Sequence, residues 1–252
     1  EKEDRQWRLL LLKKRSGRIP PLTDDKILTA WNGLMITSMA KAYRICGDKK
    51  YLESASRAAN FILAKMRTKE GRLLRSSRNS QAQIKAFLDD YANLIEGLTQ
   101  LYEADFDQRW LTEAEALTES MDKLFGSPAG AGYYYTANEG KRLISRSRSF
   151  GDSAVPNGNA TACWSLLRLH ALTGKSAYRS KAEKILEAAS TSIKRQPRST
   201  MKFLRCADVV INGSREVIIA AADAESAKEW LREAGLAYHP SQVVLLSTPD
   251  LK

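Results

Sequence analysis

Three stretches of the sequence place aspartates and amides directly in front of an apolar run. They are TDDKILTAWNGLM from Thr23, FLDDYANLIEGL from Phe87 and FGDSAVPNGNATACWSLL from Phe150. Their carboxylates are Asp24, Asp25, Asp89, Asp90 and Asp152. Hydrolysis of a glycosidic bond needs two carboxyl groups about 5–10 Å apart. Aspartate is also a favoured helix N-cap, so each of these residues has a structural interpretation besides the chemical one.

The doubled aspartate of the second stretch, Asp89 and Asp90, carries the catalytic prediction. Adjacent side chains on a helix diverge by about 100°, so one carboxylate can cap the helix while the other faces a site. We assign the cap to Asp89 and the acid or base role to Asp90. Neighbouring carboxylates in a partly desolvated site would raise the pKa of Asp90, which suits a general acid.

Aromatic and amide residues accompany these carboxylates. Trp31 could stack on a sugar ring or pack in the core, and Asn32 could bind a hydroxyl or be a satisfied buried amide. Tyr133, Tyr134 and Tyr135 alternate on an expected strand, so at least one should face the core and at least one the site. The predicted substrate-binding residues are Asp24, Asp25, Trp31, Asn32, Tyr91, Tyr134, Asp152 and Asn157.

Other chemistries have little support in the sequence. Cys46, Cys163 and Cys206 form no CxxC, and neither HxH nor HExxH occurs, so no metal site is predicted. No glycine-rich phosphate loop follows a strand, so no cofactor is predicted. Cys46 and Cys163 fall in expected helices, where a buried, inert thiol is expected. The three dispersed cysteines indicate a reducing, cytoplasmic setting.

The composition is that of a globular protein. The chain has 252 residues, of which 43% are hydrophobic and 27% charged, and a formal net charge of +11. The basic residues are spread over helix faces and loops without a nucleic-acid motif, so nucleic-acid binding is not expected. No apolar run is long enough to span a membrane, and the first residues do not resemble a signal peptide.

The elements that must position these residues are paired helices. Asp24 or Asp25 is expected to cap an inner helix that runs to about Cys46 and carries little charge. An amphipathic outer helix, Lys50 to Met66, follows it. The pair recurs, because AYRICGDKKYL, LYEADFDQRWL and LHALTGKSAYR align without a gap at spacings of 59 and 68 residues. Such repeats predict a mainly α fold, an (α/α) toroid or part of one.

The connections between these pairs place the acidic residues at one end. Glycine-bounded β-like runs, RLL from Arg72 and GYYYT from Gly132, lie in the long connections, and binding residues concentrate on such loops. A helix from Asp4 to Arg15 precedes the repeats. The chain divides into a helical-hairpin portion, residues 1–200, and a βαβ-like appendix, residues 201–252. The appendix comprises strands Arg215–Ala221 and Gln242–Ser247 and a helix Ala224–Ala234 capped by Asp223.

The motifs PLTDDKILTAWNGLM, FLDDYANLIEGL, GYYYT and DSAVPNGNATACWSLLRL resemble the C-terminal region of the spermatogenesis-associated, thioredoxin-domain proteins, over nearly the whole chain. The resemblance implies a six-hairpin glycosidase-like barrel, related in shape to acylglucosamine 2-epimerases, with a thioredoxin-like domain upstream. Epimerases of the related barrel use histidines. His170 is expected at the short-turn end and His239 in the appendix, so any catalysis here should be glycosidase-like carboxylate chemistry.

Two functions follow as hypotheses. The first is a carbohydrate-active or carbohydrate-binding region with an acidic funnel at the long-loop end and a sugar ligand. The alternative is a non-catalytic scaffold that docks a thioredoxin-like domain or a partner protein.

Overall fold

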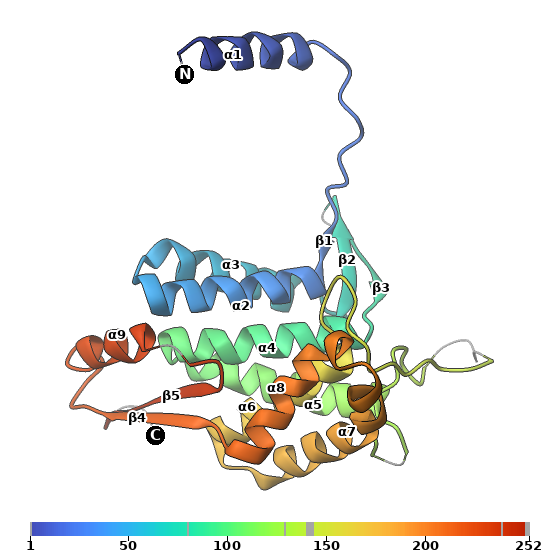
Figure 1. Cartoon of the computed structure of the whole chain (residues 1–252), viewed down its shortest axis with the longest axis vertical. Helices are drawn as coiled ribbons and strands as arrows, with labels where there is room; N and C mark the ends of the chain where they lie inside the picture. The colour runs from blue at the N-terminus through green and yellow to red at the C-terminus, as the bar shows by residue number, and fades with distance from the viewer. Residues whose placement is uncertain (1, 80, 129, 140–143, 238, 250–252) are drawn as a thin grey trace.

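The computed structural model describes residues 2–79, 81–128, 130–139, 144–237 and 239–249. Most of them form helices that pair into hairpins (Figure 1). Each hairpin joins an inner helix to an outer one: α2 (Thr29–Cys46) with α3 (Lys49–Lys65), α4 (Leu88–Asp105) with α5 (Gln108–Phe125), and α6 (Gly158–Thr173) with α7 (Ser176–Arg195). The predicted repeat and the partial (α/α) toroid are confirmed, and none of the described helices is both long and apolar enough to cross a membrane.

The inner helices pack side by side, with α4 between α2 and α6. Gly33 of α2 and Gly97 of α4 allow this close approach, because a Cβ at Gly33 would lie 2.5 Å from the backbone carbon of Asn93 and one at Gly97 would lie 2.9 Å from the Gly33 carbonyl oxygen. Nearly every residue of α4 is therefore buried, including polar ones. The outer helices α3 and α5 bury only one apolar stripe each.

A fourth inner helix, absent from the sequence prediction, follows α7. After a 3-10 turn, η1 (Pro197–Ser199), the chain forms α8 (Met201–Asn212), which packs against α6 and α7 through Phe203 and Cys206. Cys163 is buried as predicted, and Cys206 is buried too. Cys46, at the end of α2, is exposed, so the prediction that it is buried is wrong. The boundary between the helical-hairpin portion and the appendix at residue 200 stays a prediction. Helix α8 lies after this boundary, in the portion predicted to be the appendix.

The described residues of the long connections include a small sheet. Strands β1 (Ile27–Leu28), β2 (Leu74–Arg78) and β3 (Gln81–Lys85) pair antiparallel in that order. The prediction of a second strand at GYYYT, from Gly132, is wrong, because this segment forms a loop. Gly130 and Gly132 have positive φ angles and Tyr133 forms only an isolated bridge with Gly126. A few backbone bonds hold the loop, such as Tyr134 N–H to the Phe125 carbonyl at 2.8 Å. The Asn159 amide adds two more, because its oxygen accepts from the Tyr133 N–H at 2.7 Å and its nitrogen donates to the Tyr133 carbonyl at 2.9 Å.

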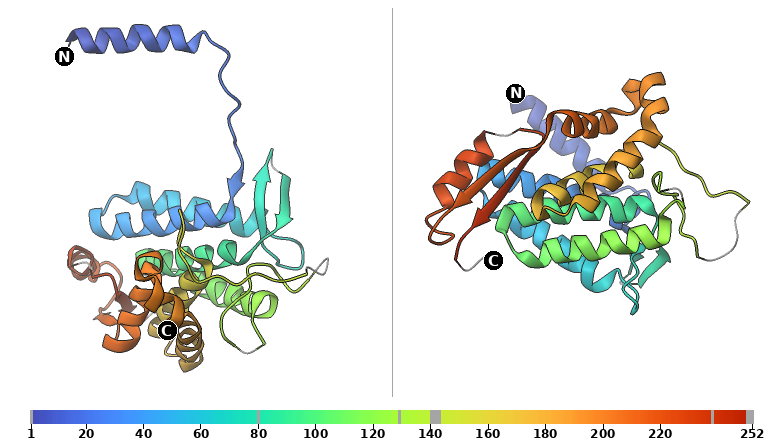
Figure 2. Two further views of the ribbon diagram at one scale, coloured as in Figure 1. Left: turned by 45° about the vertical axis from the view of Figure 1, so that its right-hand side comes forward. Right: turned by 90° about the horizontal axis from the view of Figure 1, so that it is seen from below.

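The appendix is a parallel βαβ unit made of β4 (Arg215–Ala220), α9 (Lys228–Leu236) and β5 (Gln242–Ser247), as predicted. The helix begins later than expected, because Asp223 closes a turn with Ser226 instead of capping it. In Figure 2 the unit lies against the C-terminal ends of α2 and α4.

A buried carboxylate fastens this unit to the inner helices. Glu103 of α4, with a side chain 0% exposed, pairs with Arg44 of α2 at 3.0 Å and with Arg168 of α6. Its Oε2 atom also accepts a hydrogen bond from the Val244 N–H of β5 at 3.0 Å. The carboxylate therefore joins three inner helices to the appendix.

The first helix, α1 (Lys2–Ser16), stands apart from the rest of the chain in Figure 1 and in the left view of Figure 2. Its large apolar side chains are exposed, among them Trp7 at 64% and Leu11 at 68%. The sequence predicted this helix, and the structure shows nothing packed against it within the described residues.

Candidate functional site

The N-terminal ends of the inner helices lie together at the end of the molecule that carries the long loops, here called the loop end (Figure 1). Side chains of the predicted acidic stretches join these ends. Asp90 of α4 accepts a hydrogen bond from the Ala30 N–H of α2 at 3.0 Å. Asp152 accepts from the N–H groups of Asn157, before α6, at 2.8 Å, and of Lys202, in α8, at 3.2 Å. Asp90 thus joins the second acidic stretch to the first, and Asp152 joins the third to the start of α8.

Asp90 is the capping carboxylate of this pair, so the assignment of the cap to Asp89 is wrong. The Asp90 side chain is 1% exposed. Its Oδ2 atom accepts from the Phe87 N–H at 2.9 Å, closing a capping box, and lies 3.2 Å from Arg75 Nη1. Burial raises the pKa of Asp90 to about 6, against the opposing effect of the Phe87 N–H.

Asp89 faces outward beside it. Its side chain is 19% exposed, and Oδ1 lies 3.5 Å from Arg75 Nη1. Arg75, on β2, therefore bridges the two carboxylates. Burial alone would lower the pKa of the Arg75 guanidinium, but the charges of Asp90 and Asp89 outweigh burial, so the pKa is raised. Asp89 is the carboxylate of the pair that can reach a ligand.

Aromatic rings complete the group. Phe87 and Tyr135 stack with centroids 5.0 Å apart and planes 13° apart, and the Arg75 guanidinium lies 5.0 Å from the Phe87 centroid. We call Arg75, Phe87, Asp89, Asp90 and Tyr135 the mouth cluster. Sequence reasoning missed its Arg75, and selected Tyr134 where Tyr135 belongs. Strand alternation would have placed Tyr135 on the buried face with Tyr133, whereas the loop leaves it 38% exposed, so no local signal marked it.

The first acidic stretch contributes less than expected. The helix begins at Thr29, with no side-chain cap, so neither Asp24 nor Asp25 caps it. Asp24 pairs with Lys26 at 3.2 Å and Asp25 with Arg78 of β2 at 2.6 Å. Asp90 supplies the missing acceptor from the neighbouring hairpin.

The predicted tryptophan and amide of α2 have different surroundings. Trp31 is 63% exposed at the start of the helix, so it is available for stacking and does not pack in the core. Asn32 donates to the Leu28 carbonyl at 2.9 Å, which is the satisfied-amide alternative.

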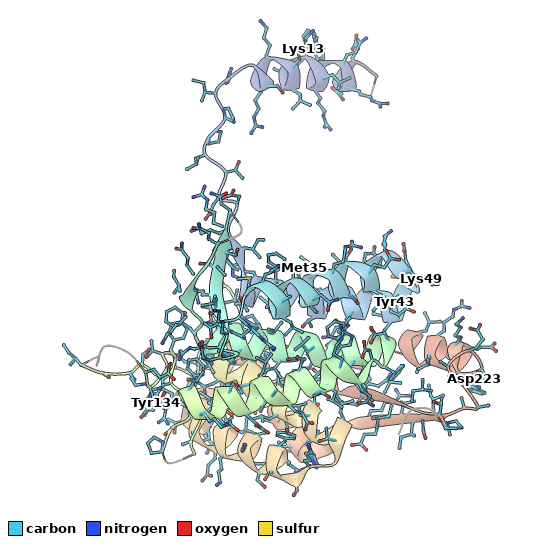
Figure 3. The ribbon with its side chains drawn as sticks, turned by 180° about the vertical axis from the view of Figure 1, so that it is seen from behind. Lys13, Met35, Tyr43, Lys49, Tyr134 and Asp223 are labelled. Atoms are coloured by element: carbon cyan, nitrogen blue, oxygen red, sulfur yellow. The ribbon has the colours of Figure 1, made fainter. Side chains whose placement is uncertain are left out.

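The remaining predicted residues have structural contacts. Tyr91 is fully buried, with its hydroxyl accepting from the Leu73 N–H at 3.1 Å, so it does not line the loop end as predicted. Tyr134 is at the loop end in Figure 3, with the Arg146 guanidinium 4.2 Å from its centroid. Asn157 caps α6, accepting from the Asn159 N–H at 2.9 Å, and Asp152 serves α6 and α8 as described above.

Histidine and metal chemistry find no support at the loop end. His170 is in the last turn of α6, the opposite end, as expected, and its Nδ1 lies 3.3 Å from the Lys175 carbonyl. His239 contacts Ser241 in the appendix at 2.9 Å. Within the ranges that the structure describes, no group of three or more metal-ligating side chains is assembled.

No family model matches the sequence. Curated relatives do: Spermatogenesis-associated protein 20 of Homo sapiens is 30% identical over 251 residues, covering 95% of this chain and 32% of that protein. The same protein of Rattus norvegicus is 32% identical over the same shares. The chain therefore spans about a third of the length of these relatives, and the resemblance to the spermatogenesis-associated, thioredoxin-domain family is confirmed.

Solved structures share the fold at low identity. The GH76 α-mannanase of Bacteroides thetaiotaomicron aligns with a TM-score of 0.59 and 14% identity over 86% of this chain and 59% of its own. A sugar epimerase from a ruminal bacterium aligns with a TM-score of 0.56 and 18% identity, over 67% of this chain and 45% of its own. A Salegentibacter α-1,6-mannanase aligns with a TM-score of 0.54 and 16% identity, over 65% of this chain and 47% of its own. It is an inactive variant with two consecutive aspartates replaced by alanine, in complex with α-1,6-mannotetrose. The fold is thus that of carbohydrate-active α/α barrels.

Proposed function

We propose that this chain is the carbohydrate-binding region of a larger thioredoxin-domain protein, with its site at the mouth cluster. The observation that carries the proposal is the partly exposed Asp89–Arg75 pair beside the Phe87–Tyr135 stack, at the N-terminal ends of the inner helices. The inactive mannanase variant, which lacks two consecutive aspartates, adds support from a protein of similar fold.

The chemistry of the cluster suits a sugar. The Asp89 carboxylate accepts hydrogen bonds from sugar hydroxyls, and Arg75 donates to them. The exposed Trp31 ring and Tyr135 offer apolar faces for the C–H surface of a pyranose. Asp90 holds the ends of α2 and α4 in place, so that Asp89 and Arg75 keep their geometry.

Turnover, where it occurs, uses carboxylates. Asp89 is the exposed base or nucleophile, and Asp90, with a side chain 1% exposed and bonded to the N–H groups of Ala30 and Phe87, is the positioning residue behind it. His170 is at the opposite end of α6 and takes no part. In the same proposal the protein works in a reducing, cytoplasmic setting.

The test is titration of α-1,6-mannotetraose followed by calorimetry, with Asp89→Asn and Trp31→Ala as variants. Both substitutions should abolish binding while leaving the melting temperature within a few degrees of the parent. Two matched controls, Asp208→Asn and Trp230→Ala, alter exposed residues away from the loop end and should bind as the parent does. Binding that survives Asp89→Asn would refute the placement of the site.

A second function, a scaffold that docks a thioredoxin-like domain, is favoured by a different observation. Apolar side chains lie exposed on α1 and along α2, including Leu11 at 68% and Met35 at 54%. Figure 3 shows Met35 on the surface of α2. Light scattering of the protein mixed with a thioredoxin-like domain of a relative tests this function. A complex that forms with the parent and is lost in Leu11→Glu supports docking, and equal masses alone and mixed would oppose it.

A further inference from the structure

A second group of charged side chains lies on the inner helices, deeper than the mouth cluster. It consists of Lys41 on α2, Glu96 on α4, and Lys202 and Arg205 on α8. Glu96 lies seven positions after Asp89 on α4, which is about 10 Å along the helix axis. Lys202 is in the first turn of α8, whose N-terminal end belongs to the loop end, so the two groups adjoin.

One ion pair forms within this group. Lys202 Nζ lies 2.5 Å from Glu96 Oε2, with side chains 12% and 5% exposed. Burial alone would raise the pKa of Glu96, but the charges of Lys202 and Lys41 hold it below its usual value. Three cations, Lys202, Lys41 and Arg205, therefore act on the Glu96 carboxylate, and Lys202 is the one that forms an ion pair with it.

Lys41 is left with an incomplete balance of charge. Among the residues that the structure describes, no carboxylate lies within ion-pairing distance of it. Burial lowers the pKa of Lys41 to about 8, and the repulsion of Arg205, Arg168 and Lys202 outnumbers the single attraction of Glu96. Lys41 is only partly exposed, and a partly buried cation without a carboxylate partner favours an anion beside it.

Arg205 adds directed donors. Its guanidinium lies 3.7 Å from the centroid of the Trp164 ring, and it donates to the Pro240 carbonyl. Its Nε atom and Trp164 Nε1 are buried, and neither has an acceptor in the described part of the chain. Arg168, the other guanidinium near Trp164, forms an ion pair with Glu103 instead.

We propose that Lys41, Lys202 and Arg205 form an anion subsite that takes the carboxylate or phosphate of an acidic sugar. This inference deepens the proposed function and rests on it, since the mouth cluster would hold the hydroxyls of the same ligand. Glu96, the carboxylate beside these cations, lies about 10 Å along α4 from Asp89, which is the length of one to two pyranose rings. The charge excess, three cations against one carboxylate, selects such a ligand over a neutral one.

The experiment compares glucose, glucuronate and glucose 6-phosphate at low salt by calorimetry. Both anionic sugars should bind at least about tenfold more tightly than glucose, equivalent to about 1.4 kcal/mol. Lys41→Met and Arg205→Met should each remove this advantage. The matched controls Lys65→Met and Arg57→Met, at exposed positions on the outer helix α3, should keep it. Equal affinity for the three sugars, or an equal loss in the controls, would overturn the subsite.

A second measurement separates this inference from the carbohydrate proposal. Inorganic phosphate should shift the 13Cε resonance of Lys41, identified by its absence in Lys41→Met, and should raise the pKa that it reports. A shift with phosphate but no binding of any sugar would keep the anion subsite and reject the carbohydrate function. An unshifted Lys41 resonance at saturating phosphate would reject the subsite. Asp89→Asn should weaken all three sugars together and leave the phosphate response unchanged.

Discussion

The two ends of α4 both carry buried or half-buried acids, but they use them differently. At the C-terminal end, Glu103 has a side chain 0% exposed and is held by Arg44, Arg168 and the Val244 N–H. At the N-terminal end, Asp89 is 19% exposed and has Arg75 as an ion-pair partner at 3.5 Å. Asp90 resembles Glu103 more than it resembles Asp89, because its oxygens accept hydrogen bonds from the N–H groups of Ala30 and Phe87.

This difference separates structural from functional carboxylates. A carboxylate whose oxygens are occupied by protein donors has no capacity left for a ligand, and removing it leaves buried donors without partners. A carboxylate with an open side can exchange water for sugar hydroxyls at little cost to the fold. We therefore expect stability to depend on Glu103 and Asp90, and binding on Asp89.

The largest effect should come from Glu103→Gln. Two guanidinium groups would lose their buried counter-charge, and we expect unfolding free energy to fall by about 3–5 kcal/mol. Urea unfolding followed by circular dichroism measures it. The control Glu119→Gln, on the exposed side of α5, should stay within about 0.5 kcal/mol of the parent. A loss at Glu103 no larger than in the control would show that the ion pairs contribute nothing.

The next effect is a dependence on pH that belongs to Asp90. Burial raises the pKa of this carboxyl from its ordinary 3.8 to about 6, so the folded state binds the proton more tightly than the unfolded state. Its contribution to stability is complete below about pH 4 and is lost as the pH rises through 6. Each pKa unit corresponds to ~1.4 kcal/mol, so the loss is on the order of 3 kcal/mol. Urea unfolding from pH 4 to 7 should show this slope in the parent and lack it in Asp90→Asn.

A smaller loss is expected for Asp90→Ala at neutral pH. The N–H groups of Ala30 and Phe87 would lose their acceptor, one of them at a helix end, and stability should fall by about 2 kcal/mol. Thermal melts of Asp90→Ala and Asp89→Ala, side by side, make the measurement. Equal melting temperatures would contradict the assignment of a structural role to Asp90 and of a binding role to Asp89.

The smallest change in stability should accompany Asp89→Asn. The side chain keeps its shape and loses one partner at 3.5 Å, so the free energy of unfolding should change by less than about 0.5 kcal/mol. Mannotetraose binding should nevertheless disappear, as measured by calorimetry. A large destabilisation with binding intact would place Asp89 with Glu103 as a structural residue.

The sequence predicted those features that local pattern determines. The three hairpins followed from the repeat, and strand β5 has the predicted bounds, Gln242–Ser247. The cap of α2 could not be predicted, because its acceptor, Asp90, comes from another hairpin and leaves no local signal near Thr29.

The candidate site was predicted in part for the same reason. The adjacent aspartates were found because their types are unusual in front of an apolar run. Arg75 was missed because its role depends on the sheet that brings β2 against the start of α4. The loop at Tyr134 was misjudged as a strand because the bonds that shape it come from Asn159, far along the chain.

The bond between Glu103 and Val244 joins residues 141 positions apart, which has a consequence for the order of events during synthesis. At the ribosomal rate of about 5–20 residues per second, α4 exists for on the order of 10 s before β5 leaves the ribosome. During that time the Glu103 carboxylate of α4 lacks the Val244 N–H donor. We expect the nascent chain to remain sensitive to protease until residue 244 has emerged, and to gain resistance in one late step.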